Sequence, residues 1–340
     1  MKPLLAALLP AFLLLASPCS AAQDADPSAA ASTDPISVPS ASPGDDIEDD
    51  SVNKEGDGSQ DGAEGELDIE RVLFEGPPSI SQRLEEEGSG RDNRFALVAH
   101  RPSYLIPLSY NFQADDTSFA ASGYDASIDS LEMAFQISLK VPMWNEPLGD
   151  DTQLSFGYTQ RAWWQAYNSE VSRPFRETNH EPEVMLDVIN DFEILGFTNR
   201  VIRFGINHQS NGRAEPFSRS WNRLYTEFLL ERGRFAISFK PWVRIPERAE
   251  DDDNPDIDEY MGHFELRLGW RNGDNNFTLM LRNHTESKGA HGAAELTYSY
   301  ALSPKARGYV QIFNGYGESL IDYNRSVTRL GIGIQLTDWL

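Results

Sequence analysis

The stretch FELRLGW at residues 264–270 decides the fold, because its apolar residues alternate one by one with Glu265, Arg267 and Gly269. Side chains on a β-strand point to opposite faces in turn, so this segment predicts a strand with one apolar and one polar face. The same alternation recurs at 235–240, at 294–300 and at 329–336, close to the end of the chain. Stretches of helical periodicity are scarce in this part of the sequence.

Twelve such strands are expected from the alternation and from the turn residues between them. Their approximate ranges are 94–109, 129–142, 151–167, 182–195, 199–210, 221–232, 234–246, 257–271, 275–283, 291–302, 306–314 and 326–340. Short turns, such as 272–274, alternate with longer polar loops, such as 211–220. This layout is typical of an outer-membrane β-barrel, and strands of about ten residues suit a tilted crossing of the bilayer. Lipid cannot satisfy an open sheet edge, so the barrel must close. We therefore expect an all-β fold, a twelve-stranded antiparallel transmembrane β-barrel of the outer membrane.

A soluble antiparallel sandwich or barrel is the alternative, since its strands would also alternate, with the apolar face inward. Three features favour the membrane form. They are an export signal, the number and length of the strands, and aromatic residues near strand ends, such as Trp163, Trp164, Trp242 and Trp270.

The N-terminal part of the chain has a different composition. In residues 1–22, Lys2 precedes an apolar stretch and small residues follow, which is typical of a secretory signal peptide cut after Ala22. Residues 23–70 contain fifteen Asp or Glu, one base and no aromatic residue. Such a segment buries too little surface to offset its ordering entropy, so we expect a disordered acidic tether. A cation-binding or partner-binding tail is the alternative. Residues 71–93 are expected to be a periplasmic lead-in to a barrel at 94–340.

Charge and cysteine content exclude several classes of protein. The 340 residues include 29 Lys or Arg and 53 Asp or Glu, a net charge of −24, which excludes a nucleic-acid binder that neutralises phosphates. The single cysteine, Cys19, excludes a disulfide scaffold and a thiolate zinc site. No apolar run reaches the roughly 18–20 residues of a membrane-spanning helix.

The fifth expected strand ends in a run that is rich in residue types used in catalysis, NHQSNGRAEPFSRSWNR at 207–223. His208 and Ser210 are separated by one residue, so on a strand they are neighbours on one face, where an imidazole can deprotonate a hydroxyl. They share the parity of Phe204 and Ile206, which makes that face the apolar, lipid-facing one.

The next strand points to the same face. Asn222 shares parity with Leu224 and Phe228, and the connecting loop brings it beside His208. An amide oxygen that accepts the imidazole N–H would fix the tautomer, as the orienting group of a catalytic triad does. Polar side chains on a lipid-facing surface are costly to bury, which favours a functional role. A strand-end polar pair without chemistry is the alternative.

This run closely resembles the active-site segment of the outer-membrane phospholipase A family. The segments YTQRAWWQ at 158–165 and PFRETN at 174–179 carry the same resemblance, which covers most of residues 71–340. The family implies a twelve-stranded barrel that hydrolyses the acyl esters of phospholipids, with phospholipase A1, A2 and lysophospholipase activity, and that acts as a calcium-bound homodimer. Carried onto this sequence, the nucleophile is Ser210, the general base His208 and the orienting amide Asn222.

The same resemblance implies a calcium site shared between two subunits. Its ligands would be Ser172 from one subunit and the carbonyl of Arg213 with the hydroxyl of Ser218 from the other, one calcium per composite site and two per dimer. Oxygen ligands of this kind suit a hard cation. Glu215 stands where the family has an aspartate, which leaves a second calcium role open. If both termini face the periplasm, the loops that carry these residues emerge on the same outer side, so the active site would face the outer leaflet.

Two rival functions remain at this stage. A passive porin would carry His208 and Ser210 incidentally, although porins keep functional polar residues in the lumen. An outer-membrane protease would need carboxylate–histidine sites on the extracellular rim. The acidic loop at 250–253 is expected to be solvated, with weak calcium binding as the alternative. His284 and His291 are expected to be solvated loop residues, with a metal pair as the alternative.

Overall fold

The computed structural model describes residues 69–88, 97–116, 119, 127–283 and 291–340. The expected signal peptide, nearly all of the expected acidic tether and His284 lie outside the described residues. Residues 69 and 70, which the sequence analysis assigned to the tether, begin the helix α2 (Ile69–Phe74). Among the described helices, none is long and apolar enough to span a membrane.

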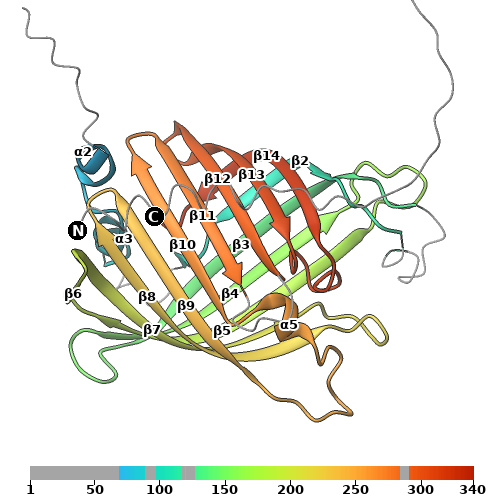
Figure 1. Ribbon diagram of the computed structural model, residues 1–340, viewed down its shortest axis with the longest axis horizontal. Helices are drawn as coiled ribbons and strands as arrows, with labels where there is room; N and C mark the ends of the chain where they lie inside the picture. Colours follow the sequence, from blue (N-terminus) through green and yellow to red (C-terminus); the bar gives the residue numbers. More distant parts are fainter. Residues whose placement is uncertain (1–68, 89–96, 117–118, 120–126, 284–290) are drawn as a thin grey trace, which may run out of the picture. The chain divides into compact units, whose positions relative to one another are not determined.

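In the described part of the chain, twelve long antiparallel strands form a single sheet that closes on itself (Figure 1). They are β2 (Ser103–Asn111), β3 (Leu131–Asn145), β4 (Thr152–Trp164), β5 (Phe175–Ile189), β7 (Phe197–Ser210), β8 (Ser220–Arg232), β9 (Phe235–Ile245), β10 (Phe264–Asn272), β11 (Asn275–Asn283), β12 (Gly292–Ser303), β13 (Ala306–Gly315) and β14 (Val327–Thr337). Each pairs with the next along the chain, and β14 pairs with β2 to close the ring. Two short strands, β1 (Val98–Ala99) and β6 (Glu193–Ile194), extend the pairing at β3 and β7. The predicted twelve-stranded antiparallel barrel is confirmed.

The two faces of the strands differ as the alternation predicts, with the apolar face outward. Along β7, Arg203 and Asn207 are buried in the lumen, whereas Phe204 and Ile206 are 48% and 49% exposed on the exterior. The outward side chains are mostly Leu, Ile, Val and Phe on every side of the barrel. An apolar exterior around a polar lumen is the pattern of a barrel whose solvent is lipid, so the soluble alternative is wrong.

Ion pairs fill the lumen and tie strands together across it. Arg176 contacts Glu132 at 3.1 Å and Asp322 at 2.6 Å, and Arg329 contacts the same Glu132 at 2.7 Å. All four side chains are almost completely buried. Charges at such depth are stable only when each finds a partner, which these do.

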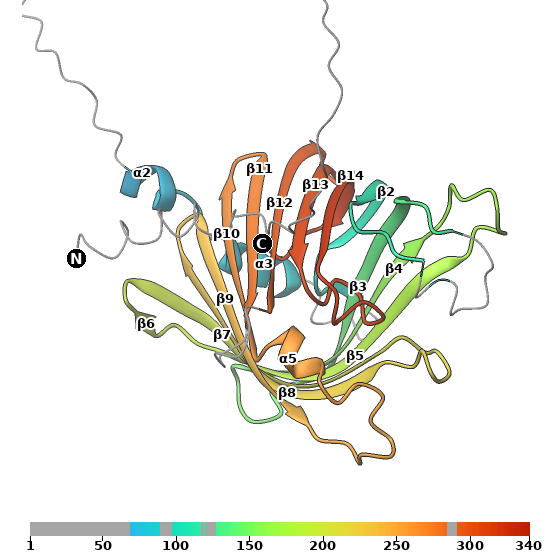
Figure 2. The same ribbon diagram turned by 45° about the vertical axis from the view of Figure 1, so that its right-hand side comes forward.

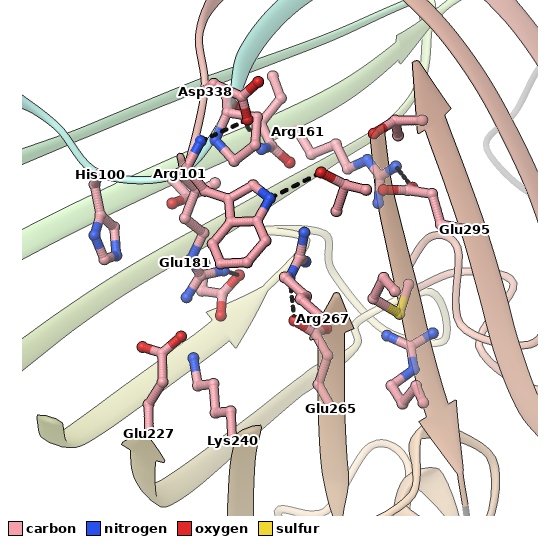
Figure 3. A pocket seen from close by; sticks show the side chains of 18 of the residues that line it. His100, Arg101, Arg161, Glu181, Glu227, Lys240, Glu265, Arg267, Glu295 and Asp338 are labelled. Carbon is pink, nitrogen blue, oxygen red and sulfur yellow. Dashed lines mark hydrogen bonds and ion pairs between the residues drawn. The ribbon is translucent and has the colours of Figure 1, made fainter. Parts of the chain in front are cut away.

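A cavity of about 180 Å³ remains within the lumen (Figure 3). Arg101 donates to Glu181 at 2.7 Å on one side of it, and Arg267 donates to Glu265 at 2.6 Å on another. The carboxylates and guanidinium groups around the cavity are therefore largely paired with one another.

Helix α3 (Ser79–Gly88) docks at the end of the barrel that carries the short turns. Its first-turn amide at Ile80 donates to the Glu231 carboxylate at 2.7 Å, so a lumen residue caps the positive end of the helix. Arg83 on the same helix donates to the carbonyls of Trp339 at 2.6 Å and His100 at 2.7 Å. The expected lead-in at 71–93 is thus partly helical, and α3 is bonded to the barrel interior.

A glycine in the β8–β9 turn permits the last residue of α2 to lie close against that turn. Gly233 has a φ of +53°, and a Cβ at this position would lie 1.7 Å from the carbonyl oxygen of Phe74 at the end of α2. Only glycine satisfies both the left-handed turn and the close approach of the backbone.

Three expected strand boundaries are wrong. Residues 257–271 do not form one strand, because Ile257–Met261 is the helix α5 and β10 begins only at Phe264. The strand expected at 182–195 begins already at Phe175, and the one expected at 94–109 runs from Ser103, with residues 98–99 as a separate short strand.

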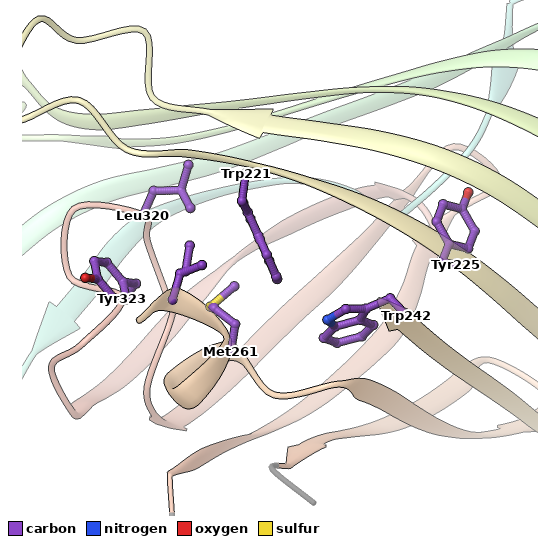
Figure 4. Packing of buried hydrophobic residues seen from close by; sticks show 7 residues of the cluster. Trp221, Tyr225, Trp242, Met261, Leu320 and Tyr323 are labelled. Atoms are coloured by element: carbon purple, nitrogen blue, oxygen red, sulfur yellow. The ribbon is translucent and has the colours of Figure 1, made fainter. Parts of the chain in front are cut away.

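Helix α5 closes over an apolar cluster at the long-loop end of the barrel (Figure 4). Ile257 and Met261, one turn apart, pack against Trp221 and Trp242, and the indole of Trp242 donates to the carbonyl of Gly262 at 2.9 Å. Trp221 of this cluster is the second residue of β8, so the cluster anchors the end of the loop that carries Arg213 and Ser218.

Candidate active site

His208 and Asn222 face each other across neighbouring strands. Their Cα atoms are register partners in the β7–β8 pairing, and His208 Nδ1 lies 2.8 Å from Asn222 Oδ1. Because an amide oxygen can only accept, the imidazole carries its proton on Nδ1 in this bond. The other ring nitrogen, Nε2, is then left unprotonated and basic.

Ser210 is the last residue of β7 and shares the outward face with His208. It is the register partner of Ser220 on β8 and of His180 on β5, and its side chain is partly buried. In the described part of the chain, no hydrogen bond joins the Ser210 hydroxyl to His208. Hydrogen bonds of a catalytic pair are often formed only with substrate present, so the arrangement suits a nucleophile and its base.

The amide of Asn222 is held at both ends. Its Nδ2 donates to Glu247 Oε1 at 2.7 Å, while its Oδ1 faces His208. Glu247 lies two residues beyond the end of β9, and the sequence analysis did not single it out. The register places Ile245 opposite Asn222, but Glu247 lies beyond the end of the strand, so period-two alternation gave no signal for its contact.

The loop after Ser210 is folded around the side chain of Asn211. Its Oδ1 accepts from the amides of Arg213 and Arg219, at 3.3 and 3.0 Å, and its Nδ2 donates to the Phe217 carbonyl at 2.9 Å. The Arg213 guanidinium turns toward β5 and pairs with Glu177 at 3.0 Å. The side chain of Arg213 is therefore part of the framework of the loop.

Gly212 offers a backbone donor two residues after Ser210. The amides on either side of it are engaged, that of Asn211 with the Arg219 carbonyl at 3.0 Å and that of Arg213 with Asn211 Oδ1. Within the described ranges, the Gly212 amide itself has no acceptor. With a φ of +65°, it occupies a conformation that other residues adopt only with strain. A backbone N–H without an acceptor, this near in sequence to Ser210, could donate a hydrogen bond to an oxyanion.

The three expected metal ligands lie on two neighbouring outer loops. Arg213 and Ser218 share the loop between β7 and β8, and Ser172 is exposed in the loop between β4 and β5. The Ser218 hydroxyl also donates to the carboxylate of Asp253. The acidic loop at 250–253 was expected to be solvated, but it folds back so that Asp253 contacts Ser218, which nothing in the sequence indicates.

The donor set fits a hard cation. Among the residues that the structure describes, no cluster of three or more His, Cys, Asp or Glu could hold a metal. The outer loops instead offer hydroxyl, carbonyl and carboxylate oxygens, which calcium accepts readily, with water in the remaining positions.

These features define an outer-membrane β-barrel that carries a serine, a histidine and an asparagine together on its outside. The profile of the phospholipase A1 family matches residues 80–336. Phospholipase A1 of Escherichia coli strain K12 is 43% identical over 261 residues, 76% of this chain and 86% of that protein. The structure of outer membrane phospholipase A from E. coli superposes with a TM-score of 0.68 at 41% identity, covering 72% of this chain and 100% of that one.

A third similar structure is the outer membrane phospholipase dimer of Salmonella typhi with bound calcium. Its TM-score is 0.68 at 40% identity, over 72% of this chain and 94% of that one. The chain belongs to the phospholipase A1 family, and it is a β-barrel of the bacterial outer membrane. The predicted family and localisation are confirmed, and the porin and protease interpretations are set aside.

Proposed function

We propose that this chain is a calcium-dependent phospholipase that cleaves the acyl esters of membrane phospholipids through Ser210, His208 and Asn222. Its activities would be those of a phospholipase A1 and A2 and of a lysophospholipase, in a homodimer whose sites face the outer leaflet. One observation carries the proposal. The 2.8 Å contact between His208 and Asn222 lies on the lipid-facing side of the barrel, and His208 is two residues before Ser210 on the same strand. The family membership supports the same reading.

The proposed reaction is an acyl transfer in two halves. The Ser210 oxygen attacks the acyl carbonyl carbon while His208 Nε2 takes the hydroxyl proton, and the Asn222 oxygen holds the ring by its Nδ1–H. Collapse of the tetrahedral intermediate breaks the ester bond, and His208 gives its proton to the departing lysophospholipid oxygen. A water molecule, deprotonated by His208, then releases the fatty acid from Ser210.

The negative charge that develops on the former carbonyl oxygen needs a donor. The free amide of Gly212 follows the nucleophile by two residues and is the candidate. When calcium is bound nearby, its positive charge supplies additional stabilisation of this oxyanion.

Arg213 through its carbonyl and Ser218 through its hydroxyl would hold the calcium, together with Ser172 of the partner subunit. This gives one calcium per composite site and two per dimer. The Salmonella relative is a dimer with bound calcium, which supports calcium binding by a dimer of this chain. The contact between Ser218 and Asp253 supports an additional carboxylate in the donor set, which would add negative charge where a divalent cation binds.

A direct assay tests the proposed function. The purified protein in detergent is given phospholipid in mixed micelles, and fatty-acid release is followed while calcium is titrated. We expect release that rises with calcium, stops with a chelator and is absent in Ser210→Ala. Release that is indifferent to both calcium and Ser210 would contradict the proposal. Lipids labelled in one acyl chain at a time separate A1 from A2 cleavage.

A further inference from the structure

Three side chains from successive strands form a continuous hydrogen-bonded line on the outer face. His208 on β7 contacts Asn222 on β8 at 2.8 Å, and Asn222 contacts Glu247, just after β9, at 2.7 Å. The line ends in the carboxylate of Glu247, so the neutral amide of Asn222 lies between the imidazole of His208 and this carboxylate.

A primary amide is an ambiguous orienting group for an imidazole. Its oxygen accepts and its nitrogen donates, and the two ends have nearly the same shape. If the Asn222 amide turned over, Nδ2 would donate to His208 Nδ1, and the ring would keep its proton on Nε2. Ser210 would then face a ring nitrogen that cannot take its proton.

A carboxylate removes this ambiguity because an ionised carboxylate only accepts hydrogen bonds. With Glu247 Oε1 on one side, the amide must present Nδ2 to Glu247 and therefore Oδ1 to His208. Hydrogen bonds to a charged partner are stronger than those between neutral groups. The bond therefore selects one orientation of Asn222 and, through it, one tautomer of His208.

The position of Glu247 follows from the sheet. Ile245, the last residue of β9, is the register partner of Asn222, and Glu247 has the same parity. Pro246, between them, fixes one backbone angle of the connection. In the part of the chain that the structure describes, Glu247 makes no ion pair, whereas the neighbouring Arg248 pairs with Glu250 and Asp251. The bond to Asn222 is thus the contact that its carboxylate makes.

We propose that Glu247 is a positioning residue of this enzyme, which fixes the Asn222 amide so that His208 is held as a base toward Ser210. The proposal rests on the proposed function, since it acts through the same three residues. It does not place Glu247 in contact with substrate.

The test uses the full-length protein in detergent with saturating calcium. The variants are Glu247→Ala, Glu247→Gln, Asn222→Ala and the double variant Glu247→Ala/Asn222→Ala. Glu250→Ala is the matched control, because Glu250 lies on the same loop with a side chain that is 74% exposed. For each variant, kcat and KM are measured separately, and the heat-resistant migration of the folded barrel on gels is recorded.

We expect Glu247→Ala to lower kcat about tenfold with little change in KM, since one hydrogen bond to a charged group is lost and no substrate contact is removed. Glu247→Gln should keep most of the wild-type kcat, because its carbonyl oxygen can still accept from Nδ2. In the Asn222→Ala background, Glu247→Ala should change nothing further, since the partner through which it acts is gone.

The outcomes distinguish a failure of the Glu247 inference from a failure of the proposed catalytic triad. If Asn222→Ala lowers kcat but Glu247→Ala does not, Glu247 has no positioning role and the triad stands. If the two changes are additive in kcat, Glu247 acts elsewhere and the inference is overturned. If Asn222→Ala itself leaves kcat unchanged, the proposed triad fails, and this inference fails with it. A loss in Glu247→Ala that Gln does not restore contradicts the hydrogen-bond account.

Discussion

At the scale of single residues, the polar groups of the site lie at the end of their strands. Ser210 ends β7, and His208 is two residues away, roughly 7 Å at the rise of a strand. This depth suits the ester groups of a phospholipid, which lie at the boundary between hydrocarbon and headgroups. It also limits the cost of placing polar side chains on a lipid-facing surface.

The nucleophile and base are expected to act as one unit. His208→Ala and Ser210→Ala should each lower kcat by a factor on the order of 10²–10⁴ or more, because neither residue works without the other. The double variant should be no worse than the poorer single variant. Both variants should still migrate as folded, heat-resistant barrels, since neither side chain joins the lumen ion pairs. Losses that multiply in the double variant would contradict a shared role.

The period-two alternation in the sequence was enough to predict that His208, Ser210 and Asn222 share one face, because strand geometry fixes which side chains lie on the same side. The same reasoning could not find Glu247 or Asp253. Both lie on the long connection after β9, and their contacts depend on how that loop folds, which period-two alternation does not encode.

At the scale of the elements, α3 is held in the barrel mouth by a buried ion-pair cluster. Glu87 contacts Lys140 at 2.7 Å and Arg83 at 2.9 Å. Burial alone would raise the pKa of the Glu87 carboxyl, but the charges of Lys140 and Arg83 outweigh this effect and hold its pKa at about 2, against an ordinary value of 4.5. The pairing therefore favours the ionised, docked state.

This shift predicts how α3 responds to acid. A carboxyl whose pKa is lower in the folded state adds stability that is complete above pH 4.5 and is lost as the pH falls toward 2. The protection of the α3 amides from hydrogen exchange, relative to the unfolded chain at the same pH, should therefore fall between these values. In Glu87→Gln, this protection should be lower at neutral pH and should lose most of its pH dependence. Glu85→Gln is the control, since Glu85 is exposed. Exchange in Glu87→Gln that matches the wild type at every pH would refute the ion-pair role.

The wrongly predicted boundaries have a common physical origin. The first residues of β5 were assigned to a loop because Arg176, Glu177 and Glu181 make the segment polar, yet these are lumen residues that pair inside the barrel. Helix α5 was missed because its two apolar anchors, Ile257 and Met261, are stabilised by tertiary packing on Trp242 rather than by a long periodic stretch.

At the scale of the whole molecule, the lumen of the closed barrel is filled with paired side chains, and the proposed active site lies on the outer face. Helix α3 docks at the short-turn end, α5 with its apolar cluster covers the long-loop end, and ion pairs fill the lumen. Strand count, closure and the direction of each face were all predictable from the sequence, because alternation and lipid as a solvent leave few other solutions. Helices α3 and α5 were not, since both depend on contacts within the lumen.

The proposed sharing of calcium between two subunits predicts how mixed dimers behave. Ser172→Ala and Ser218→Ala should each raise the calcium concentration needed for activity and shift the protein toward monomer, since metal and dimerisation favour each other by linkage. A heterodimer of the two variants has one composite site with both defects and one intact site. Mixing should therefore restore part of the calcium response.

The readout is the calcium dependence of fatty-acid release, measured with the heterodimer verified by cross-linking. If all ligands came from one subunit, every site would keep a defect and mixing would restore nothing. No recovery in verified heterodimers would rule out the shared site while leaving the catalytic residues untouched.

The acidic segment is expected to be dispensable for catalysis. Deletion of residues 23–68 removes no aromatic residue and no alternating stretch, and it leaves α2 intact. Barrel assembly and calcium-dependent hydrolysis should then match those of the full chain, as measured by heat-resistant gel migration and by fatty-acid release. Failure of the barrel to assemble would show that the segment contributes to folding.

The central claim is that Ser210, on the lipid-facing side of the barrel, forms the acyl bond. The most direct measurement is to inactivate the protein with a long-chain sulfonyl fluoride in the presence of calcium and to locate the adduct by mass spectrometry. The account predicts one adduct per chain, on the Ser210 hydroxyl, no adduct in Ser210→Ala, and a labelling rate that falls sharply in His208→Ala. An adduct on any other residue, or labelling that persists in Ser210→Ala, would contradict it.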